Sequence, residues 1–338
     1  MTLKIGFTYD LQDDYLKQGF TPEEVAELDF QDTIDGVEQA LLKCGFKVER
    51  IGNIQQLVQV LSAGKRYDFI FNIAEGMHGR GRESAIPALL DAYQIPYTFS
   101  DPATIALTLD KAYTKRILRD AKIATSPFYI IRSIEDIDSV PKSLFYPLFI
   151  KPVAEGSSKG IYANSLINSE NQLQKGVRQL LEKFKQPVLV EQYLSGREFS
   201  VGMLGTGPNA RILGVVEITM NSEHNFFCQS LKWGKLHDKP SVKLVEDAKA
   251  DEVAFLALET WKLLGCRDAG RVDIKCDDTG KPYVLEVNPI SGLCPGFQDL
   301  NMQSILVFIS ESAGLPYDGL IKAIADYAIM RTNTTTTL

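Results

Sequence analysis

The chain has 338 residues and a formal net charge of −7 at pH 7, and 45% of its residues are hydrophobic. This length exceeds that of a usual single hydrophobic core and predicts two or three domains. The acidic balance argues against a general nucleic-acid-binding protein, because neutralising a phosphate backbone needs a basic surface. No apolar run reaches the length of a membrane span, so we expect neither a nucleic-acid partner nor a membrane partner.

The cysteines and histidines indicate which redox state and which metal sites to expect. The five cysteines are odd in number, scattered along the chain and without a C-x-x-C spacing. They are typical of reduced thiols, and with no signal-peptide pattern in view we expect a cytoplasmic protein. The three histidines lack ligand-like spacing, which argues against a zinc site.

The N-terminal part of the chain alternates strand patterns with helix patterns. Strands are expected at 3–9, 46–51 and 67–73, and helices at 33–44, 54–63 and 84–93. Strands that alternate with helices indicate a parallel sheet in an α/β domain. The segment 95–99 leaves this domain, and one continuous helix is then expected at 105–120, carrying Asp110, Lys111 and Lys115.

The remainder of the chain has an α+β pattern. Strands are expected at 145–151, 187–191, 199–204 and 212–218, and helices at 252–264, 304–312 and 317–331. The long connection 220–242 carries Phe226, Phe227 and Trp233, which makes it either a lid over a reaction centre or a plain surface excursion. The polar tail 332–338 is expected to be disordered.

A glycine-rich loop follows the strand expected at 145–151. Its sequence is Lys151-Pro-Val-Ala-Glu-Gly-Ser-Ser-Lys-Gly-Ile161, which lacks the Walker A spacing. Glycines let the backbone approach a ligand, and successive N–H groups can hold phosphate oxygens. The alternative is an ordinary Gly/Ser hairpin loop. Further along, Glu191 and Glu198 carry carboxylates that can accept from ribose hydroxyls, or that belong to a solvated acidic turn.

The segment 271–288 has the pattern of a β-hairpin, with Asp-Thr-Gly supplying the turn. Side chains alternate along a strand, so Arg271 and Asp273 share one face, as do Glu286 and Asn288. Pairing the strands gathers two carboxylates, an amide oxygen and a guanidinium into one patch. Hard oxygen ligands of this kind suit Mg²⁺. The alternative is the solvated outer face of an ordinary hairpin.

Five motifs stand in a fixed order along the chain. They are Asp110-Lys111, Lys151-Pro-x-x-Glu-Gly-Ser-Ser-x-Gly160, Glu191-x-Tyr-Leu-x-Gly-Arg-Glu198, Arg271-Val-Asp273 and Glu286-Val-Asn288. This ordered set resembles the D-alanine–D-alanine ligase family of ATP-grasp ligases, over about residues 96–314. The resemblance implies α/β and α+β parts in an ATP-grasp fold with an N-terminal parallel-sheet domain. The implied divisions are an N-terminal domain 1–104, a central subdomain 105–186, a C-terminal subdomain 187–331 and the tail 332–338.

The resemblance also implies a role for individual residues. Those expected to contact ATP are Lys111, Lys151, Glu155, Gly156, Ser157, Ser158, Gly160, Glu191, Tyr193, Leu194, Glu198 and Leu285. The ligands of two Mg²⁺ ions, with Mn²⁺ as the alternative ion, would be Asp273, Glu286 and Asn288. The catalytic residues would be Arg271, Ser157 and Lys232, and the substrates would contact Glu27, Arg82, Glu83, Arg271 and Gly296.

The activity that the resemblance implies is an ATP-dependent carboxylate–amine ligase acting on amino acids or other small carboxylates and amines. One carboxylate attacks the γ-phosphorus of ATP, and an amine then displaces phosphate from the acyl phosphate. Both steps concentrate negative charge, which accounts for metal ions, lysines and an arginine in one site. The resemblance also implies a homodimer.

Three substrate-facing segments depart from the family pattern. Residues 6–10 replace a glycine-rich loop, Arg82 stands where an acidic residue is expected, and 289–297 is longer than the corresponding turn. We therefore expect a changed specificity, and the positive charge of Arg80 and Arg82 would suit an acidic substrate. The alternatives are authentic D-alanine–D-alanine synthesis, a secondary-metabolite ligase such as one that joins amino acids to a mycosporine core, and a non-catalytic nucleotide-binding relative.

Overall fold

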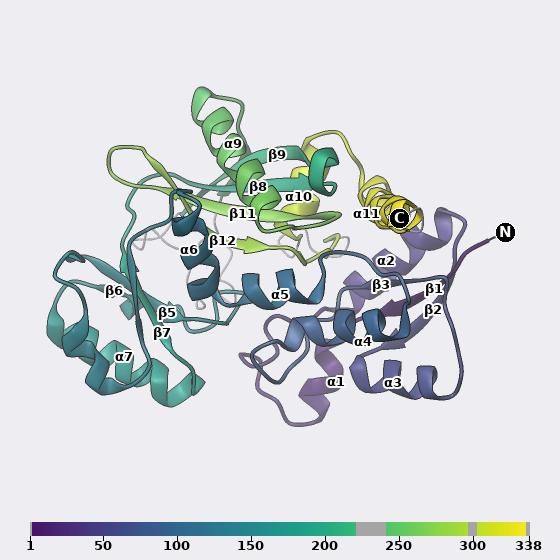
Figure 1. Ribbon diagram of the computed structural model, residues 1–338, viewed down its shortest axis with the longest axis horizontal. Coiled ribbons are helices and arrows are strands. Elements are labelled where there is room, and N and C mark those ends of the chain that lie inside the picture. The colour runs from purple at the N-terminus through teal and green to yellow at the C-terminus, as the bar shows by residue number, and fades with distance from the viewer. Residues whose placement is uncertain (1, 221–240, 297–302, 336–338) are drawn as a thin grey trace.

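The structure, a computed structural model, describes residues 2–220, 241–296 and 303–335, with side chains as far as residue 332. Within these ranges the chain forms three sheets, of three, four and five strands. Figure 1 shows the three-stranded sheet on the side of the N-terminus, the four-stranded sheet at the opposite end, and the five-stranded sheet above both. None of the described helices has both the length and the apolar character that crossing a membrane requires.

The N-terminal sheet is parallel, as the alternating pattern predicts. Its strands are β1 (Lys4–Thr8), β2 (Lys47–Gly52) and β3 (Phe69–Asn72), in the order β2-β1-β3. One face packs against α2 (Gln31–Lys43), and the other packs against α3 (Ile54–Ser62) and α4 (Ala85–Tyr93). Because helices cover both faces, all four residues of β3 are buried. The short helices α1 (Gln12–Lys17) and η1 (Arg82–Ser84) complete this part.

The central sheet is antiparallel and is covered by a single long helix. Its strands are β4 (Phe128–Ile131), β5 (Leu148–Pro152), β6 (Leu166–Ile167) and β7 (Val188–Gln192), in the order β4-β7-β5-β6. The covering helix is α7 (Glu170–Phe184), and the short helices η2 (Ile134–Ser139) and η3 (Ala163–Ser165) lie beside it. The expected strands at 145–151 and 187–191 are confirmed, whereas β4 and α7 were not predicted from the sequence.

The C-terminal sheet is also antiparallel. Its strands are β8 (Glu198–Leu204), β9 (Arg211–Thr219), β10 (Ser241–Leu244), β11 (Ala269–Cys276) and β12 (Pro282–Asn288), in the order β10-β9-β8-β11-β12, with η4 (Gly207–Asn209) between β8 and β9. Helix α9 (Ala248–Leu263) packs on one face, where the fully buried Trp261 donates its indole N–H to the Gly205 carbonyl at 3.1 Å. Helix α10 (Ile305–Ser312) approaches the sheet closely at Gly202, where an added Cβ would lie 2.8 Å from Ile309.

The segment 105–120 forms two helices, so the expectation of one continuous helix is wrong. Helix α5 spans Pro102–Leu109 and helix α6 spans Lys111–Asp120. Asp110 separates them with a non-helical ψ of 96°, and its carboxylate accepts from the N–H groups of Ala112 and Tyr113. An aspartate in this position satisfies N–H groups that would otherwise lack partners at a helix start. The break places Lys111 at the first turn of α6.

The last helix, α11 (Tyr317–Thr335), returns to the N-terminal sheet and packs against α2 (Figure 1). The expected disordered tail at 332–338 is wrong for its first four residues, because the helix continues through Thr335. The described cysteines Cys44, Cys266, Cys276 and Cys294 are free thiols, in agreement with the sequence, and Cys228 lies outside the described residues.

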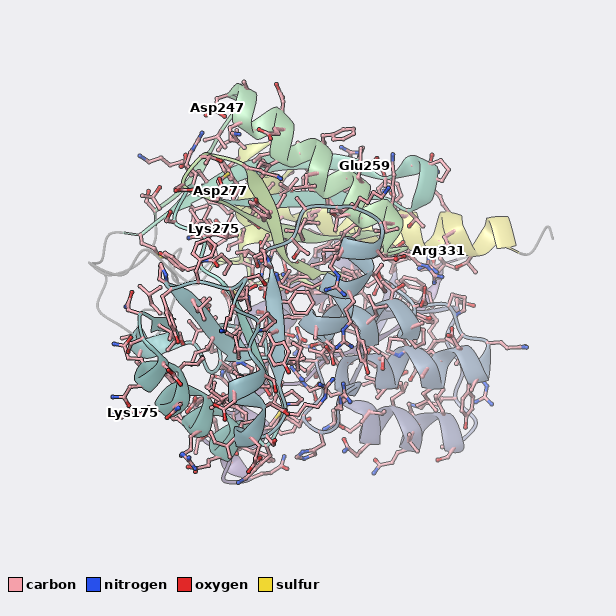
Figure 2. All side chains as sticks on the ribbon, turned by 60° about the vertical axis from the view of Figure 1, so that its left-hand side comes forward. Lys175, Asp247, Glu259, Lys275, Asp277 and Arg331 are labelled. Carbon is pink, nitrogen blue, oxygen red and sulfur yellow. The ribbon has the colours of Figure 1, made fainter. Side chains whose placement is uncertain are left out.

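Removing Arg331 is expected to destabilise the junction between α11 and the N-terminal part of the chain. Figure 2 shows Arg331 on α11, where its guanidinium contacts the fully buried carboxylate of Asp268 at 2.9 Å and the carbonyl of Tyr97 at 3.0 Å. Removing one partner of a buried ion pair typically costs about 3 kcal/mol, because the other charge stays buried. Arg331→Ala should therefore lower the urea midpoint measured by circular dichroism.

The exposed pair Lys322–Asp326 on the same helix provides the control. Lys322→Ala should change the free energy of unfolding by less than about 0.5 kcal/mol, because exposed i,i+4 pairs contribute little. Equal midpoints for Arg331→Ala and Lys322→Ala would show that the junction does not depend on Arg331.

Candidate active site

The hairpin predicted at 271–288 is present, and its polar side chains meet as the alternation requires. In the antiparallel register Arg271 lies opposite Asn288, and Asp273 lies opposite Glu286. The Asn288 amide donates to Asp273 at 3.1 Å, and Arg271 forms an ion pair with the same carboxylate oxygen. Ser200 of β8 donates to the other Asp273 oxygen at 2.7 Å. Asp273 is only 8% exposed, which excludes the alternative of a solvated outer face.

The two carboxylates of this patch have opposite pKa shifts. Burial raises the pKa of Asp273, and the neighbouring Glu286 raises it further against the effect of Arg271. Burial also opposes the ionisation of Glu286, but Lys111, Lys151 and Arg271 together lower its pKa to about 2. Glu286 is therefore a permanent anion that faces three cations, whereas Asp273 ionises less readily.

Lys111, Lys151 and Glu286 converge beneath the glycine-rich loop. The Lys111 ammonium lies 2.5 Å from the Glu155 carbonyl oxygen and 3.4 Å from a Glu286 carboxylate oxygen. Together with the loop these side chains enclose a cavity of about 40 Å³, lined by Lys111, Lys151, Pro152, Glu155, Gly156, Ser158, Lys159, Ile161 and Glu286. A volume of this size holds little more than one water molecule.

The loop has a backbone conformation that few L-residues adopt. Ser157, Ser158 and Gly160 have φ angles of 48°, 60° and 76°. At Gly160 an added Cβ would lie 2.4 Å from the Pro152 side chain, so a glycine is required there. Left-handed serines are uncommon and typically occur where a functional site imposes the strain.

The N-terminal part of the chain holds the same loop. Arg82 donates to the Ala154 carbonyl at 2.9 Å and pairs with Glu27 at 2.8 Å. The Glu27 carboxylate also accepts from the Gly156 N–H and lies 3.3 Å from the Lys159 ammonium. Both Glu27 and Arg82 have side chains that are only 7% exposed. The Glu27 carboxylate, which we expected to bind a substrate, is thus already paired with Arg82, Lys159 and the Gly156 N–H.

Both arginines on which the hypothesis of an acidic substrate rests have carboxylate partners in the protein. Arg80 pairs with Asp110 at 2.7 Å, and Arg82 pairs with Glu27 and, at 3.6 Å, with Glu83. The two guanidinium groups are therefore already neutralised by carboxylates of the protein. Sequence inspection could not detect the pairs with Asp110 and Glu27, because these partners lie 30 and 55 residues away along the chain.

Sequence reasoning missed Glu75, which lies in the loop that follows β3. It has no hydrogen bond or ion pair with any other residue that the structure describes, whereas its neighbours are paired. Burial raises its pKa well above the ordinary value, and the carboxylates of Glu83, Glu27 and Asp29 raise it further. Its charge also acts on Arg271 across the site. Its place after a parallel strand is a signal in the sequence, because ligands bind at the carboxyl ends of such strands.

Some of the residues expected to contact the nucleoside are buried, and the others are half-buried. Glu191 is 3% exposed and contacts Lys151 at 2.9 Å and Lys115 at 2.8 Å, which excludes a solvated turn. Tyr193 stacks on Phe149 with a centroid distance of 6.3 Å.

Glu198, expected at the ribose, pairs with Lys275 at 2.6 Å; Figure 2 shows Lys275 beside Asp277 near the end of β11. Leu194 is buried, and Leu285 is half-buried on β12 next to Glu286.

The chain is similar to proteins of a known family. Residues 117–326, more than half of the chain, match the family model described as D-ala D-ala ligase C-terminus. The chain belongs to the D-alanine–D-alanine ligase family. It is therefore an ATP-dependent, ADP-forming ligase that makes C–N bonds. The resemblance drawn from the five motifs is confirmed.

Relatives of similar length support the assignment. The chain is 32% identical to a D-alanine–D-alanine ligase of Bordetella petrii, over 87% of this chain and 85% of that protein. It is 31% identical to an uncharacterised protein of Sinorhizobium fredii, over 88% and 87%.

Solved structures establish the ATP-grasp fold. The ATP complex of a Bacillus anthracis D-alanine–D-alanine ligase has a TM-score of 0.75 at 20% identity, covering 99% of each chain. The VanG D-Ala:D-Ser ligase of Enterococcus faecalis has a TM-score of 0.74 at 19% identity, covering 97% of this chain and 100% of that one.

Three remaining features of the ligase complete the description. The predicted catalytic Lys232 and most of the candidate lid at 220–242 lie outside the described residues. The segment after Asn288 is described as far as Gly296, which has a φ of 69°.

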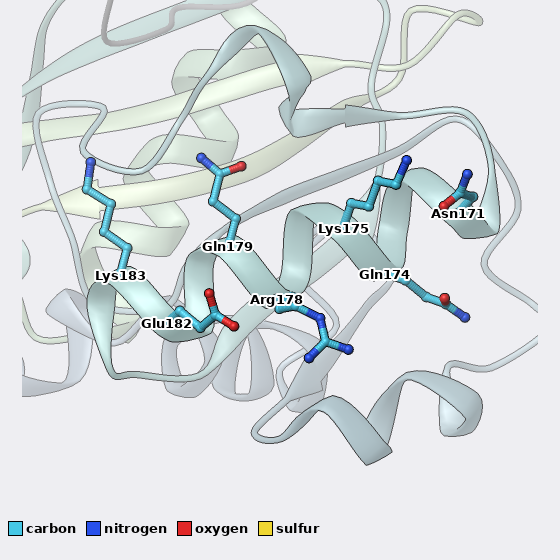
Figure 3. A pocket seen from close by; sticks show the side chains of 7 residues that line it. All are labelled: Asn171, Gln174, Lys175, Arg178, Gln179, Glu182 and Lys183. Atoms are coloured by element: carbon cyan, nitrogen blue, oxygen red, sulfur yellow. The ribbon is translucent and has the colours of Figure 1, made fainter.

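A polar groove follows the outer face of α7 (Figure 3), lined by Asn171, Gln174, Lys175, Arg178, Gln179, Glu182 and Lys183. All of these residues belong to one helix, and none of them belongs to the site.

Proposed function

We propose that this ligase uses ATP and Mg²⁺ to join the carboxylate of one amino acid to an amine, through an acyl phosphate. The observation that carries the proposal is the convergence of Lys111, Lys151 and Glu286 on one cavity beneath the glycine-rich loop. Two lysines and a permanent anion beside Asp273 supply the charges that phosphoryl transfer needs. In that reaction the carboxylate oxygen bonds to the γ-phosphorus as ADP leaves. The amine then bonds to the acyl carbon, phosphate leaves and the amine releases a proton.

The donor set on β11 and β12 fits Mg²⁺. Asp273 and Glu286 supply carboxylate oxygens from paired positions, and Asn288 supplies an amide oxygen two residues further on. Bound there, Mg²⁺, or Mn²⁺ in its place, would offset negative charge on the phosphates. The proposal includes two such ions. Arg271 extends from the same strands, and we assign it to the negative charge that develops on the acyl oxygen during amine attack.

The other predicted residues divide between the phosphate and nucleoside ends. The loop residues Glu155, Gly156, Ser157, Ser158 and Gly160 would cover the phosphates. Tyr193, Leu194 and Leu285 would surround adenine, and Glu198 would accept from the ribose in place of Lys275. Because the Glu191 carboxylate is buried between two lysines, its contribution to adenine would come through the backbone of β7.

For the first amino acid we propose Glu75 as the anchor of the ammonium group. Glu27, the candidate from the sequence, is already paired with Arg82 and Lys159. Glu75 forms no ion pair with any described residue, although Arg82 and Arg271 act on it through space, and an ammonium ion would supply a direct counter-charge. Its through-space electrostatic interaction with Arg271 supports a position on the reacting side of the site.

Glu75→Gln should raise the KM of the first amino acid about 10- to 100-fold, because a hydrogen bond between charged groups contributes roughly 1.5–3 kcal/mol. The KM of ATP should stay within about twofold of the wild-type value, since the change lies outside the phosphate cavity. Steady-state kinetics with each substrate varied in turn would measure both constants. Glu182→Gln, on the outer face of α7, is the control (Figure 3). An unchanged amino-acid KM would remove Glu75 from the substrate site.

The function itself is tested by phosphate release from ATP and Mg²⁺ in the presence of a panel of amino acids. The panel should contain D- and L-alanine, D-serine, and acidic and basic amino acids, with mass spectrometry of the products. Phosphate release that depends on an amino acid, with a new amide, supports the proposal. D-alanyl-D-alanine as the preferred product would establish the authentic family reaction, and its relatives' names make this the first pair to test. Nucleotide binding without any turnover would contradict the proposal.

We also infer a homodimer, which rests on the family resemblance alone. Light scattering coupled to gel filtration of the full chain would measure its mass. A single species of 37.6 kDa, the mass of one chain, would contradict the dimer.

A further inference from the structure

Lys115 is a buried lysine with a complete set of partners. It lies on α6, one turn after Lys111, and is 1% exposed. Its ammonium contacts Glu191 of β7, Thr125 and Ser126, each at 2.8 Å. These three acceptors use all three ammonium protons. Lys115 therefore does not reach a ligand and acts only through the groups that it holds.

The most important of these groups is Glu191, which two lysines share. One carboxylate oxygen of Glu191 contacts Lys151 at 2.9 Å, and the other contacts Lys115 and accepts from the Ser126 hydroxyl at 2.7 Å. Burial opposes ionisation of Glu191, yet Lys115 and Lys151 hold its pKa well below the ordinary value. The three side chains thus form a buried group with two positive charges and one negative charge.

The charge balance of this group depends on Lys115. With Lys115 present, one unit of positive charge remains, and Lys151 carries it to the wall of the phosphate cavity. Without Lys115, Glu191 would have Lys151 as its only cationic partner and would neutralise it. A lysine held by a carboxylate in a buried setting is a poorer phosphate ligand, because binding phosphate would leave that carboxylate unpaired.

We propose that Lys115 is a positioning residue for nucleotide binding. Lys115 pairs with the Glu191 carboxylate, so that the charge of Lys151 remains available to the phosphates of ATP. The proposal rests on the phosphate-binding role proposed for Lys151. Lys115 also orders the adjacent wall of the site, because Thr125 donates to the Val284 carbonyl at 3.0 Å. That contact joins the segment after α6 to β12, the strand that carries Leu285 and Glu286.

The test is the dissociation constant of Mg²⁺-ATP, measured by titration calorimetry on the full chain. Lys115→Met should weaken binding about 30-fold, as expected for losing a charge-assisted contact. Lys151→Met should weaken it by a similar factor, and the double variant should be no weaker than Lys151→Met alone. The KM of ATP should rise in parallel, while kcat of Lys115→Met stays within about threefold of wild type. A purely structural role would lower the melting temperature and kcat without this non-additivity.

Two further variants keep the test independent of folding. In the double variant K115M/E191Q both buried charges are removed, so Lys151 has no competing carboxylate, and ATP affinity should recover to within about threefold of wild type. Lys115→Arg should also retain affinity, and Lys175→Met on the outer face of α7 is the neutral control (Figure 3). Wild-type affinity in Lys115→Met, multiplicative losses in K115M/K151M, or no recovery in K115M/E191Q would overturn the proposal. Unchanged affinity in Lys151→Met would instead contradict the proposed function.

Discussion

Glu286→Gln is expected to reduce kcat by about 10³-fold while the protein remains folded. A metal ion contributes several kcal/mol to stabilising transition-state charge, and each ~1.4 kcal/mol changes a rate tenfold. Glu286 is the more readily ionised carboxylate of the pair, with a pKa of about 2, and it faces Lys111 at 3.4 Å. Glutamine keeps the shape of the side chain and removes only the charge. Phosphate release at saturating substrate would measure the effect.

Metal dependence provides the second half of this test. Wild-type activity should be lost with EDTA and restored by Mg²⁺ or Mn²⁺, and Glu286→Gln should require a higher Mg²⁺ concentration for its residual rate. Glu259→Gln on the exposed side of α9 serves as the matched control, and Figure 2 labels Glu259 on that helix. A Glu286→Gln rate within a few-fold of wild type would contradict the metal assignment.

Arg271→Met is expected to reduce kcat by about 10²- to 10³-fold, which is typical of losing one donor to a developing negative charge. Arg271 lies on β11 two residues before Asp273 and pairs with its carboxylate. Removing the guanidinium should leave the KM of ATP within about threefold of wild type, because the phosphate lysines lie on α6 and β5. Single-turnover measurements would separate the chemical step from nucleotide binding.

Arg271→Lys distinguishes charge from geometry. A lysine keeps the positive charge but not the planar pair of donors, so it should recover only part of the lost rate. Arg178→Lys on α7 is the matched control on an exposed surface. If Arg271→Met lost ATP affinity and kept its kcat, Arg271 would belong to the nucleotide site and not to amine transfer.

The contacts of the glycine-rich loop connect the nucleotide side of the site with the N-terminal part of the chain. Glu27 accepts from the Gly156 N–H, and Arg82 donates to the Ala154 carbonyl. Gly156 also lines the cavity of about 40 Å³ beneath the loop. The pair Glu27–Arg82 therefore joins the N-terminal part of the chain to the glycine-rich loop.

The sequence predicted the local elements well where one pattern controlled them. The hairpin at 271–288 follows from alternation and a turn signal, and its register places the four polar residues together. The prediction of one continuous helix at 105–120 was wrong, because periodicity does not reveal that the Asp110 side chain caps a second helix. The expectation of a disordered tail was wrong for residues 332–335, because helix α11, which packs against α2, continues through Thr335, and composition does not report such packing.

Sequence alone determined the class of chemistry in this protein, because the order and spacing of its motifs specify which donors and acceptors lie on each strand or loop. Only the tertiary structure decided which of those charges remain available. Arg82 pairs with Glu27 across 55 residues, and Lys115 and Lys151 share Glu191 from different elements. Such pairings depend on how distant segments pack, and burial makes each unpaired charge costly. Because Glu27 is already paired in the structure, we propose Glu75 as the ammonium anchor in its place, and the two arginines that suggested an acidic substrate have carboxylate partners within the protein.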